Sequence, residues 1–212
     1  MTSDITILTD GVIGDELRNY GVSATADVCS AIRAYIPLLL HWNRRISLTT
    51  VTDPLQILRF HFGECMFAAP AIDNRNGRLA DVGSGAGFPG VPLKLLIPTL
   101  DILLIEPNAK KAAFLAEVVR ELKLESVDVY RGRFDSLTAV GFRFDYVTAR
   151  ALGMHKNLVE WSRETISIGG SMILWLGNED AVQVSLQTSW KWSRTILVPG
   201  SHSRVLLVGL AV

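Results

Sequence analysis

The chain has few cysteines and no excess of charge of either sign. Only two of its 212 residues are cysteines, and Cys29 and Cys65 are too far apart in sequence to suggest a disulfide framework or a metal site. We therefore expect a reducing, cytoplasmic environment and no bound metal. Lysine plus arginine (21) equals aspartate plus glutamate (21), so the formal net charge is zero. This balance argues against coating nucleic acid by charge alone, but not against reading a local site in RNA.

Long apolar runs, internal repeats and low-complexity tracts are also missing. The strongly apolar run at residues 34–40 contains Pro37 and is too short to span a bilayer. The first ten residues, MTSDITILTD, carry acidic side chains and no basic ones. We therefore expect neither a secretory signal nor a membrane partner.

Hydrophobic residues make up 49% of the chain and charged residues 20%, which is enough to bury a sizeable core in a single domain. Residues 1–76 predict helices that pack on that core. Ser23 or Thr25 is placed to cap a helix whose apolar residues recur every three or four positions. Pro37 is expected to kink or divide this helix. Asp53, followed by proline, predicts the start of another.

From residue 77 onward, short apolar runs alternate with helical ones, a pattern typical of a parallel sheet covered on both faces. The strands predicted within this alternation are Arg78–Val82, Asp101–Ile105, Val127–Tyr130, Phe144–Ala149 and Ser171–Leu176. One predicted helix begins at about Val91. Three others span Asn108–Lys123, Lys156–Ile166 and Glu179–Leu186. Two last strand-like runs, with no helix between them, predict an antiparallel end to the sheet near Thr195–Val198 and Val205–Gly209. The expected fold is a doubly wound α/β domain over residues 77–212 with an N-terminal helical cap.

The stretch LADVGSGAGFPGVPLKLLIP, residues 79–98, points to a ligand. Gly83, Gly85 and Gly87 follow the first predicted strand, and glycine there lets a ligand approach the main chain closely. Ligands of doubly wound sheets bind beyond the carboxyl ends of the strands. Glu106 ends the second predicted strand about 20 residues later, where a carboxylate can accept hydrogen bonds from a ribose diol. Together the loop and this acid predict a nucleoside cofactor.

Two nucleoside cofactors must be weighed. Gly85, Gly87 and Gly90 satisfy the G-x-G-x-x-G spacing of NAD-binding proteins. However, Asp81 precedes the first glycine, and the continuation FPGVP at residues 88–92 would disturb a helix N-terminus intended for a pyrophosphate. S-adenosylmethionine carries a sulfonium and an amino acid in place of phosphates. It needs backbone groups, an acidic environment and a ribose clamp, and the loop suits it better.

The whole pattern resembles one known family. The sequence DVGSGAGFPGVP, residues 81–92, is similar to the signature loop of the bacterial 16S ribosomal RNA guanine-N7 methyltransferases, also called the glucose-inhibited division protein B family. The resemblance covers roughly residues 35–210 and includes the stretches HWNRRISLTTVTDPLQILRFHFGE, LLIEPNAKKAAFL, FDYVTARAL and SRVLLVGL.

This resemblance implies a class I, Rossmann-like methyltransferase fold with S-adenosylmethionine as methyl donor. The acceptor would be N7 of a guanine in 16S rRNA or the small ribosomal subunit, and we expect the protein to act as a monomer. The loop residues would contact the cofactor, and Glu106 would bind its ribose. The residues expected at the cofactor are Asp81, Gly83, Gly85, Gly87, Phe88, Glu106, Phe134, Asp135 and Arg150.

Three of these residues have plainer interpretations that stay open. Phe134 offers an apolar face to a purine and Asp135 an acceptor to its amine, or the pair makes only a turn after a strand. Arg150 ends an apolar strand, where a charge is costly unless paired. It would border the methyl-transfer pocket, or it would form a structural salt bridge with Asp81 or Asp145.

Aromatic residues offer a similar choice. His61 would lie near the methyl-transfer pocket, or it would be a satisfied core or capping histidine. Trp190 and Trp192 share one face of a late strand, where they would stack on bases or simply pack.

Guanine N7 has a lone pair and no proton, so its methylation is a direct displacement that needs alignment and no general base. We accordingly find no Ser/His/Asp or Cys/His arrangement. The chain has Leu176 where the family usually carries lysine. Two alternatives therefore remain: a methyltransferase on a non-RNA substrate, or a non-catalytic ribosome-associated module with the same fold. A nicotinamide-dependent oxidoreductase is a more distant one.

Overall fold

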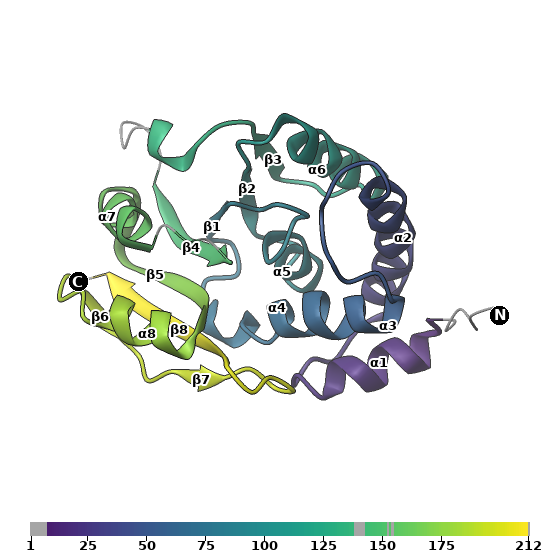
Figure 1. Ribbon diagram of the computed structural model, residues 1–212, viewed down its shortest axis with the longest axis horizontal. Helices are drawn as coiled ribbons and strands as arrows, with labels where there is room; N and C mark the ends of the chain where they lie inside the picture. Colours follow the sequence, from purple (N-terminus) through teal and green to yellow (C-terminus); the bar gives the residue numbers. More distant parts are fainter. Residues whose placement is uncertain (1–7, 138–142, 152, 154, 212) are drawn as a thin grey trace.

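A computed structural model describes residues 8–137, 143–151, 153 and 155–211 (Figure 1). Within these residues eight strands form one sheet, ordered β3-β2-β1-β4-β5-β8-β6, with β7 also paired to β8. The strands are β1 Arg78–Val82, β2 Asp101–Ile105, β3 Val127–Tyr130, β4 Phe144–Arg150, β5 Ile166–Gly177, β6 Trp190–Trp192, β7 Ile196–Leu197 and β8 Arg204–Ala211. The fold is a class I methyltransferase-like α/β sheet, as the sequence predicts.

The direction of the strands fixes where a ligand can bind. Strands β1 to β5 are parallel, whereas β8 runs antiparallel to β5, β6 and β7. The sheet grows from β1 in both directions, toward β2 on one side and β4 on the other. The carboxyl ends of β1, β2 and β4 therefore meet at the point where the strand order reverses, which is the usual binding position in such sheets.

Alternate residues of the strands serve two separate hydrophobic cores. Leu79 of β1 and Ile102 of β2 belong to the core shared with the N-terminal helices, α5 and α6. Ala80 and Leu103 point to the other face, where α7 and α8 pack. This burial of both faces explains why the parallel strands have nearly continuous apolar sequences. The helices here are α5 Gly90–Leu96, α6 Ala109–Glu121, α7 His155–Thr165 and α8 Asn178–Ser185.

The N-terminal helices begin at polar caps. The threonine hydroxyls of Thr9 and Thr25 accept a backbone N–H at the starts of α1 and α2, and Asp53 does so with its carboxylate for α3. Pro37 lies inside α2 without dividing it, because buried apolar residues on both sides hold the helix against the core. The helices are α1 Asp10–Arg18, α2 Ala26–Asn43, α3 Pro54–Ile57 and α4 Glu64–Met66.

A π-helical turn, η1 (Leu58–Gly63), joins α3 to α4 and was not predictable from hydrophobic spacing. Turns of this type occur often at functional sites because they redirect side chains and backbone carbonyls. The short 3-10 turns η2 (Ala69–Ala71) and η3 (Phe134–Ser136) complete the described elements. Among the described residues, no helix combines the length and apolar character needed to cross a membrane.

Candidate functional site

The glycine loop, residues 83–89, turns tightly at the carboxyl end of β1. Gly83, Gly85 and Gly87 have φ angles of 72°, 56° and 83°, which residues with side chains rarely adopt. At Gly87 an added Cβ would lie only 2.8 Å from Cγ2 of Val91. The N–H groups of residues 83 and 84 both donate to the carbonyl of Ile105, at 2.9 and 3.1 Å. The geometry therefore requires glycine, and it holds the loop against the end of β2.

Asp81 lies beneath this loop, not on its surface. Its fully buried carboxylate accepts hydrogen bonds from the N–H of Gly90 at 3.1 Å and from the hydroxyl of Thr148 at 3.0 Å. Burial raises the pKa of Asp81 to about 6, and the two hydrogen bonds oppose that rise. The carboxylate ties β1 to β4 and α5. In this arrangement it acts on a ligand only through the loop that it holds.

Glu106 faces the same loop from the end of β2. Its Oε2 accepts the N–H of Gly85 at 2.9 Å, and its Oε1 accepts the N–H of Asn108 at 2.8 Å. Each carboxylate oxygen has more than one lone pair. Glu106 can therefore fix the loop and still accept a ribose hydroxyl. The structure brings Glu106 and the glycines together, as the sequence predicts.

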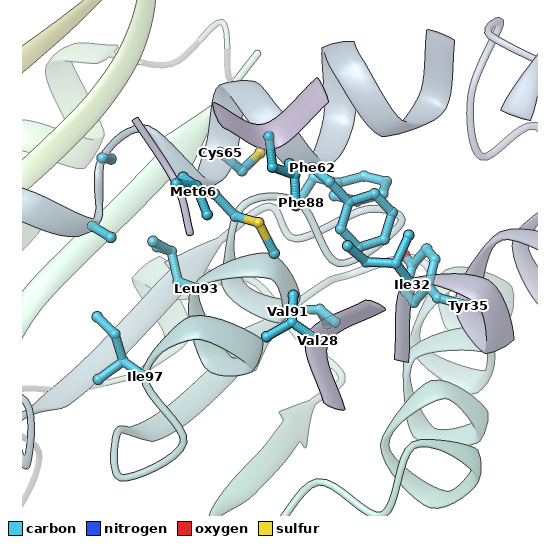
Figure 2. Packing of buried hydrophobic residues seen from close by; sticks show 14 of the residues in the cluster. Val28, Ile32, Tyr35, Phe62, Cys65, Met66, Phe88, Val91, Leu93 and Ile97 are labelled. Carbon is cyan, nitrogen blue, oxygen red and sulfur yellow. The ribbon is translucent and has the colours of Figure 1, made fainter. Parts of the chain in front are cut away.

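Phe88 anchors the loop to the N-terminal helices. Its ring centroid lies 5.5 Å from those of Tyr35 and Phe62 and 4.8 Å from that of His61 (Figure 2 shows Phe88 with Tyr35 and Phe62). Tyr35 also donates its hydroxyl to the backbone carbonyl of Ala86 in the loop. Only 9% of Phe88 is exposed, so most of its surface is used for packing.

His61 is a packed, neutral histidine. Its Nε2 lies 2.7 Å from the hydroxyl oxygen of Thr49, and its ring is tilted by 30° against Phe88. Burial, and after it the positive charge of Arg150, lower the pKa of His61 to about 4. The ring is therefore packed close to the site, as the plainer interpretation expects, but it is not fully satisfied, because its buried Nδ1 has no hydrogen-bond partner among the described residues.

The turn after β3 separates Phe134 from Asp135. The Phe134 ring packs edge-on against Trp161, 5.4 Å away, and is buried in the core. Most of the apolar face expected to meet a purine is therefore already covered. Asp135 is exposed and pairs with Arg133 through two contacts of 3.0 and 2.6 Å. It remains accessible to a ligand.

Arg150 joins the end of β4 to the π-helical turn. Its Nη2 donates to the carbonyl of Phe60 at 2.7 Å and to Oε2 of Glu64 at 3.1 Å. Its Nη1 donates to Sγ of Cys65 at 3.2 Å. Its side chain is 12% exposed. Arg150 thus lies where a β4 residue would border the site, and it is held there by the N-terminal helices.

The partner expected for Arg150 from sequence is wrong. Neither Asp81 nor Asp145 makes the ion pair; the acid is Glu64, whose Oε1 also accepts from Arg204 at 2.8 Å. Glu64 is almost fully buried, and burial raises its pKa although both guanidinium groups oppose the rise. The alternation of strands could not reveal this pairing, because Glu64 precedes the sheet and pairs with the end of β4 and the start of β8.

A cavity of about 410 Å³ opens beyond the carboxyl ends of β4 and β5, next to Arg150. Its volume is within the range of small-ligand pockets. The indole N–H of Trp175 donates to the carbonyl of Glu64 at 2.8 Å and so fixes one wall. The lining residues are Arg150, Ala151, Gly153, Trp175, Leu176, Gly177, Asp180 and Arg204.

Three residues of the site were not identified from the sequence: Tyr35, Glu64 and Arg204. Glu64 and Arg204 lie within stretches that carry the family resemblance, and this was the only signal that could have singled them out. Trp190 is buried beside Trp192, which favours packing over base stacking. No group of three potential metal ligands occurs among the residues that the structure describes.

Solved structures with the same fold include a protein in complex with S-adenosylmethionine and a methylase. A mutant of MtNAS in complex with S-adenosylmethionine matches with a TM-score of 0.59 and 16% identity, over 86% of this chain and 76% of that chain. The ribosomal protein L11 methylase from Lactobacillus delbrueckii subsp. bulgaricus matches with a TM-score of 0.60 and 13% identity, over 72% and 79%. At these identities the likeness concerns the fold alone.

The sequence comparisons are more specific. A ribosomal RNA small subunit methyltransferase G from Pseudomonas putida is 33% identical over 190 residues, covering 88% of each chain. The protein of the same name from Leuconostoc citreum is 32% identical over 167 residues, covering 76% of this chain and 70% of the relative. The sequence model of the family described as rRNA small subunit methyltransferase G matches residues 28–197. The chain therefore belongs to the rRNA small subunit methyltransferase G (GidB) family.

Proposed function

We propose that the protein transfers a methyl group from S-adenosylmethionine to N7 of a guanine in 16S rRNA of the small ribosomal subunit. One observation carries this proposal. In a chain of this family, the glycine loop and Glu106 lie at the carboxyl ends of β1 and β2, and an arginine-lined cavity lies at the same edge of the sheet, beyond β4 and β5. This supports a cofactor site and a base-sized acceptor pocket at one edge of the sheet.

The residues present fit S-adenosylmethionine. The left-handed glycines leave the loop backbone open to close approach, and Glu106 offers carboxylate oxygens for the ribose. Asp135 is accessible for a hydrogen bond to the adenine amine, whereas Phe134 would contribute mainly a ring edge. When bound, the cofactor supplies an electrophilic methyl group on a positively charged sulfur.

The chain's own contribution is to bind and orient the acceptor. Guanine N7 carries a lone pair and no proton, so the residues need not remove one. Arg150 and Arg204 line the cavity and present guanidinium donors to oxygen acceptors of a guanosine nucleotide. Arg150 is largely buried, so its guanidinium group is partly screened from water. Charge-assisted hydrogen bonds are stronger in such a screened environment than in water. Alignment is then the main source of rate enhancement.

The same proposal covers partners and location. The substrate is naked 16S rRNA or the small subunit, and the enzyme acts as a monomer in the cytoplasm, where the isolated thiols of Cys29 and Cys65 remain reduced. Residues 1–76 form a helical region that packs on the methyltransferase domain at residues 77–212. In this proposal the helical region holds the cofactor loop in place. The packing of Tyr35 and Phe62 against Phe88 supports this role.

Two measurements test this proposal. Calorimetric titration should show binding of S-adenosylhomocysteine and none of NAD. Labelled S-adenosylmethionine should transfer its methyl group to small subunits or 16S rRNA that lack N7 methylation, and not to ribosomal proteins alone. Label in protein would favour a methyltransferase with a non-RNA substrate. Cofactor binding without any transfer would favour a non-catalytic ribosome-associated module.

A further inference from the structure

One buried carboxylate lies behind both arginines of the cavity. The side chain of Glu64 is 1% exposed, that of Arg150 is 12% exposed, and that of Arg204 is 41% exposed. The two arginines therefore extend from the interior to the rim, and each is bound to a different oxygen of the same acid. Burying an acid in this way is costly unless hydrogen bonds compensate, so the arrangement needs an explanation.

The π-helical turn η1 supplies the rest of this arrangement. Phe60 lies in η1, and its carbonyl accepts from Arg150 at 2.7 Å. The ring of the same residue lies 5.9 Å from the guanidinium carbon of Arg204. Glu64 follows directly at the start of α4. One short segment thus contacts both arginines through a backbone carbonyl, an aromatic face and a carboxylate.

The two guanidinium groups have more hydrogen-bond donors than their contacts with Glu64 and the π-helical turn use. Together with Glu64 they carry a net charge of +1, and the carboxylate of Asp180, which also lines the cavity, brings the sum to zero. Each guanidinium has five N–H donors in a rigid fork. Guanine O6 and the phosphate of a nucleotide are both oxygen acceptors suited to such donors. The edge formed by the two arginines, in a cavity of about 410 Å³, is therefore suited to the oxygen acceptors of a guanosine nucleotide.

We propose that Glu64 is a positioning residue for the acceptor pocket, which holds Arg150 and Arg204 together as the edge that binds the oxygen acceptors of the target guanosine. This inference rests on the proposed function. Glu64 acts only through the arginines, because its own carboxylate is buried behind them. It also gives the N-terminal helices a direct part in forming the pocket.

The substitution Glu64→Gln separates charge from shape. The amide oxygen of glutamine can accept from one arginine, but its NH2 group must then face donors of the other. One guanidinium therefore loses its fixed position. Loss of one charge-assisted contact to the substrate corresponds to on the order of a tenfold weakening. We expect KM for the small subunit to rise by about that factor, with little change in the affinity for S-adenosylhomocysteine.

The matched control is Glu16→Gln. Glu16 makes a two-contact ion pair with Arg59, at 2.7 and 2.6 Å, between α1 and the π-helical turn and outside the cavity. Breaking that pair tests whether any lost ion pair in the N-terminal region weakens substrate binding. We expect KM in this variant to stay within about twofold of the wild-type value, because its arginine is not part of the pocket.

The experiment measures KM and kcat for methyl transfer to small subunits in the wild type, Glu64→Gln, Arg204→Gln and the double variant. Because Glu64 acts through both Arg204 and Arg150, its substitution should raise KM by a smaller factor in the Arg204→Gln background than in the wild type. A flatter salt dependence of KM in Arg204→Gln would identify the phosphate as the bound oxygen, whereas an unchanged one would identify guanine O6.

Two results would overturn the inference: a wild-type KM in Glu64→Gln, or additive effects of the two substitutions. If Glu64→Gln does not fold, an unchanged KM in Arg204→Gln would overturn it instead. Failure of the proposed function is recognised separately, because the wild-type protein itself would then transfer no methyl group to small subunits.

Discussion

The hydroxyl of Tyr35 in α2 donates a hydrogen bond to the backbone carbonyl of Ala86 in the glycine loop. Burial raises the pKa of Tyr35 well above its usual value, so the hydroxyl keeps its proton at any physiological pH. A residue of the N-terminal region therefore fixes the loop that is expected to hold the cofactor. Cofactor affinity should depend on α2 although this helix precedes the sheet.

Tyr35→Phe should weaken both the fold and the cofactor site. The buried carbonyl of Ala86 loses its donor, which costs about 1–2 kcal/mol in the free energy of unfolding. The affinity for S-adenosylhomocysteine should fall as well, because the loop is less well fixed. Urea unfolding and calorimetric titration measure the two effects.

Tyr146→Phe is the control, since its hydroxyl binds Asp73 and the N–H of Asn74, away from the loop. It should lower stability alone; equal losses of affinity in both variants would contradict the account.

Gly87→Ala should destabilise the protein by about 2 kcal/mol, because it combines a left-handed backbone with a steric clash. At this position φ is 83°, and the new Cβ would lie 2.8 Å from a methyl carbon of Val91. Gly14→Ala provides the contrast: it lies in α1, and the nearest atom is 3.7 Å from the new Cβ. That change should stabilise the protein by about 0.5–1 kcal/mol. Thermal unfolding of both variants gives the comparison.

Stability should depend on pH through His61. Its pKa is about 4 in the folded protein and 6.5 when unperturbed, so between these values the unfolded chain binds more protons. The folded state therefore loses stability as the pH falls from 6.5 toward 4, by about 2 kcal/mol at pH 5.

Buried Asp81 acts in the opposite direction. Its pKa is raised to about 6, so its contribution favours folding at low pH and is lost as the pH rises through that value. The two groups partly cancel in the wild type. Urea unfolding of His61→Gln should therefore show smaller loss of stability on acidification than the wild type. Parallel pH profiles for the two proteins would contradict the pKa assigned to His61.

Asp135→Ala should weaken cofactor binding about three- to tenfold, the effect of losing one hydrogen bond to the adenine amine. Stability should hardly change, because Asp135 is exposed and its pair with Arg133 lies at the surface. Asp128→Ala removes another exposed carboxylate, from β3 itself, and should leave affinity unchanged. If Asp135→Ala and Asp128→Ala bind the cofactor equally well, Asp135 stabilises only the turn and does not bind the cofactor.

The sheet was largely predictable because its signal is local. The bounds of β1, β2 and β3 agree with the apolar runs Arg78–Val82, Asp101–Ile105 and Val127–Tyr130. The π-helical turn was not predictable, since its wider winding leaves no mark in the three- and four-residue spacing of apolar side chains. Nor did the sequence show that β8 would lie between β5 and β6, because strand order depends on long-range pairing.

Site residues were predictable where their location depends only on their position relative to the end of a strand. The glycines and Glu106 follow the first two strands, so sequence order alone places them together. The partner of Arg150 depends instead on how the N-terminal helices dock, and Glu64 could not be identified from strand spacing. Phe88 and Phe134 were expected at the cofactor, yet both are largely buried against other aromatic rings. An apolar side chain near a site serves the core equally well, and sequence cannot separate the two uses.

The position of the transferred methyl group identifies both the substrate and the acceptor atom. Small subunits that lack N7 methylation would be treated with labelled S-adenosylmethionine and the protein, and the labelled nucleotide identified by mass spectrometry of nuclease digests. Arg150→Ala serves as the inactive control. We expect label at N7 of a single guanine in 16S rRNA, and none with the variant. Label on another atom or only in protein, or equal labelling by the variant, would contradict this expectation.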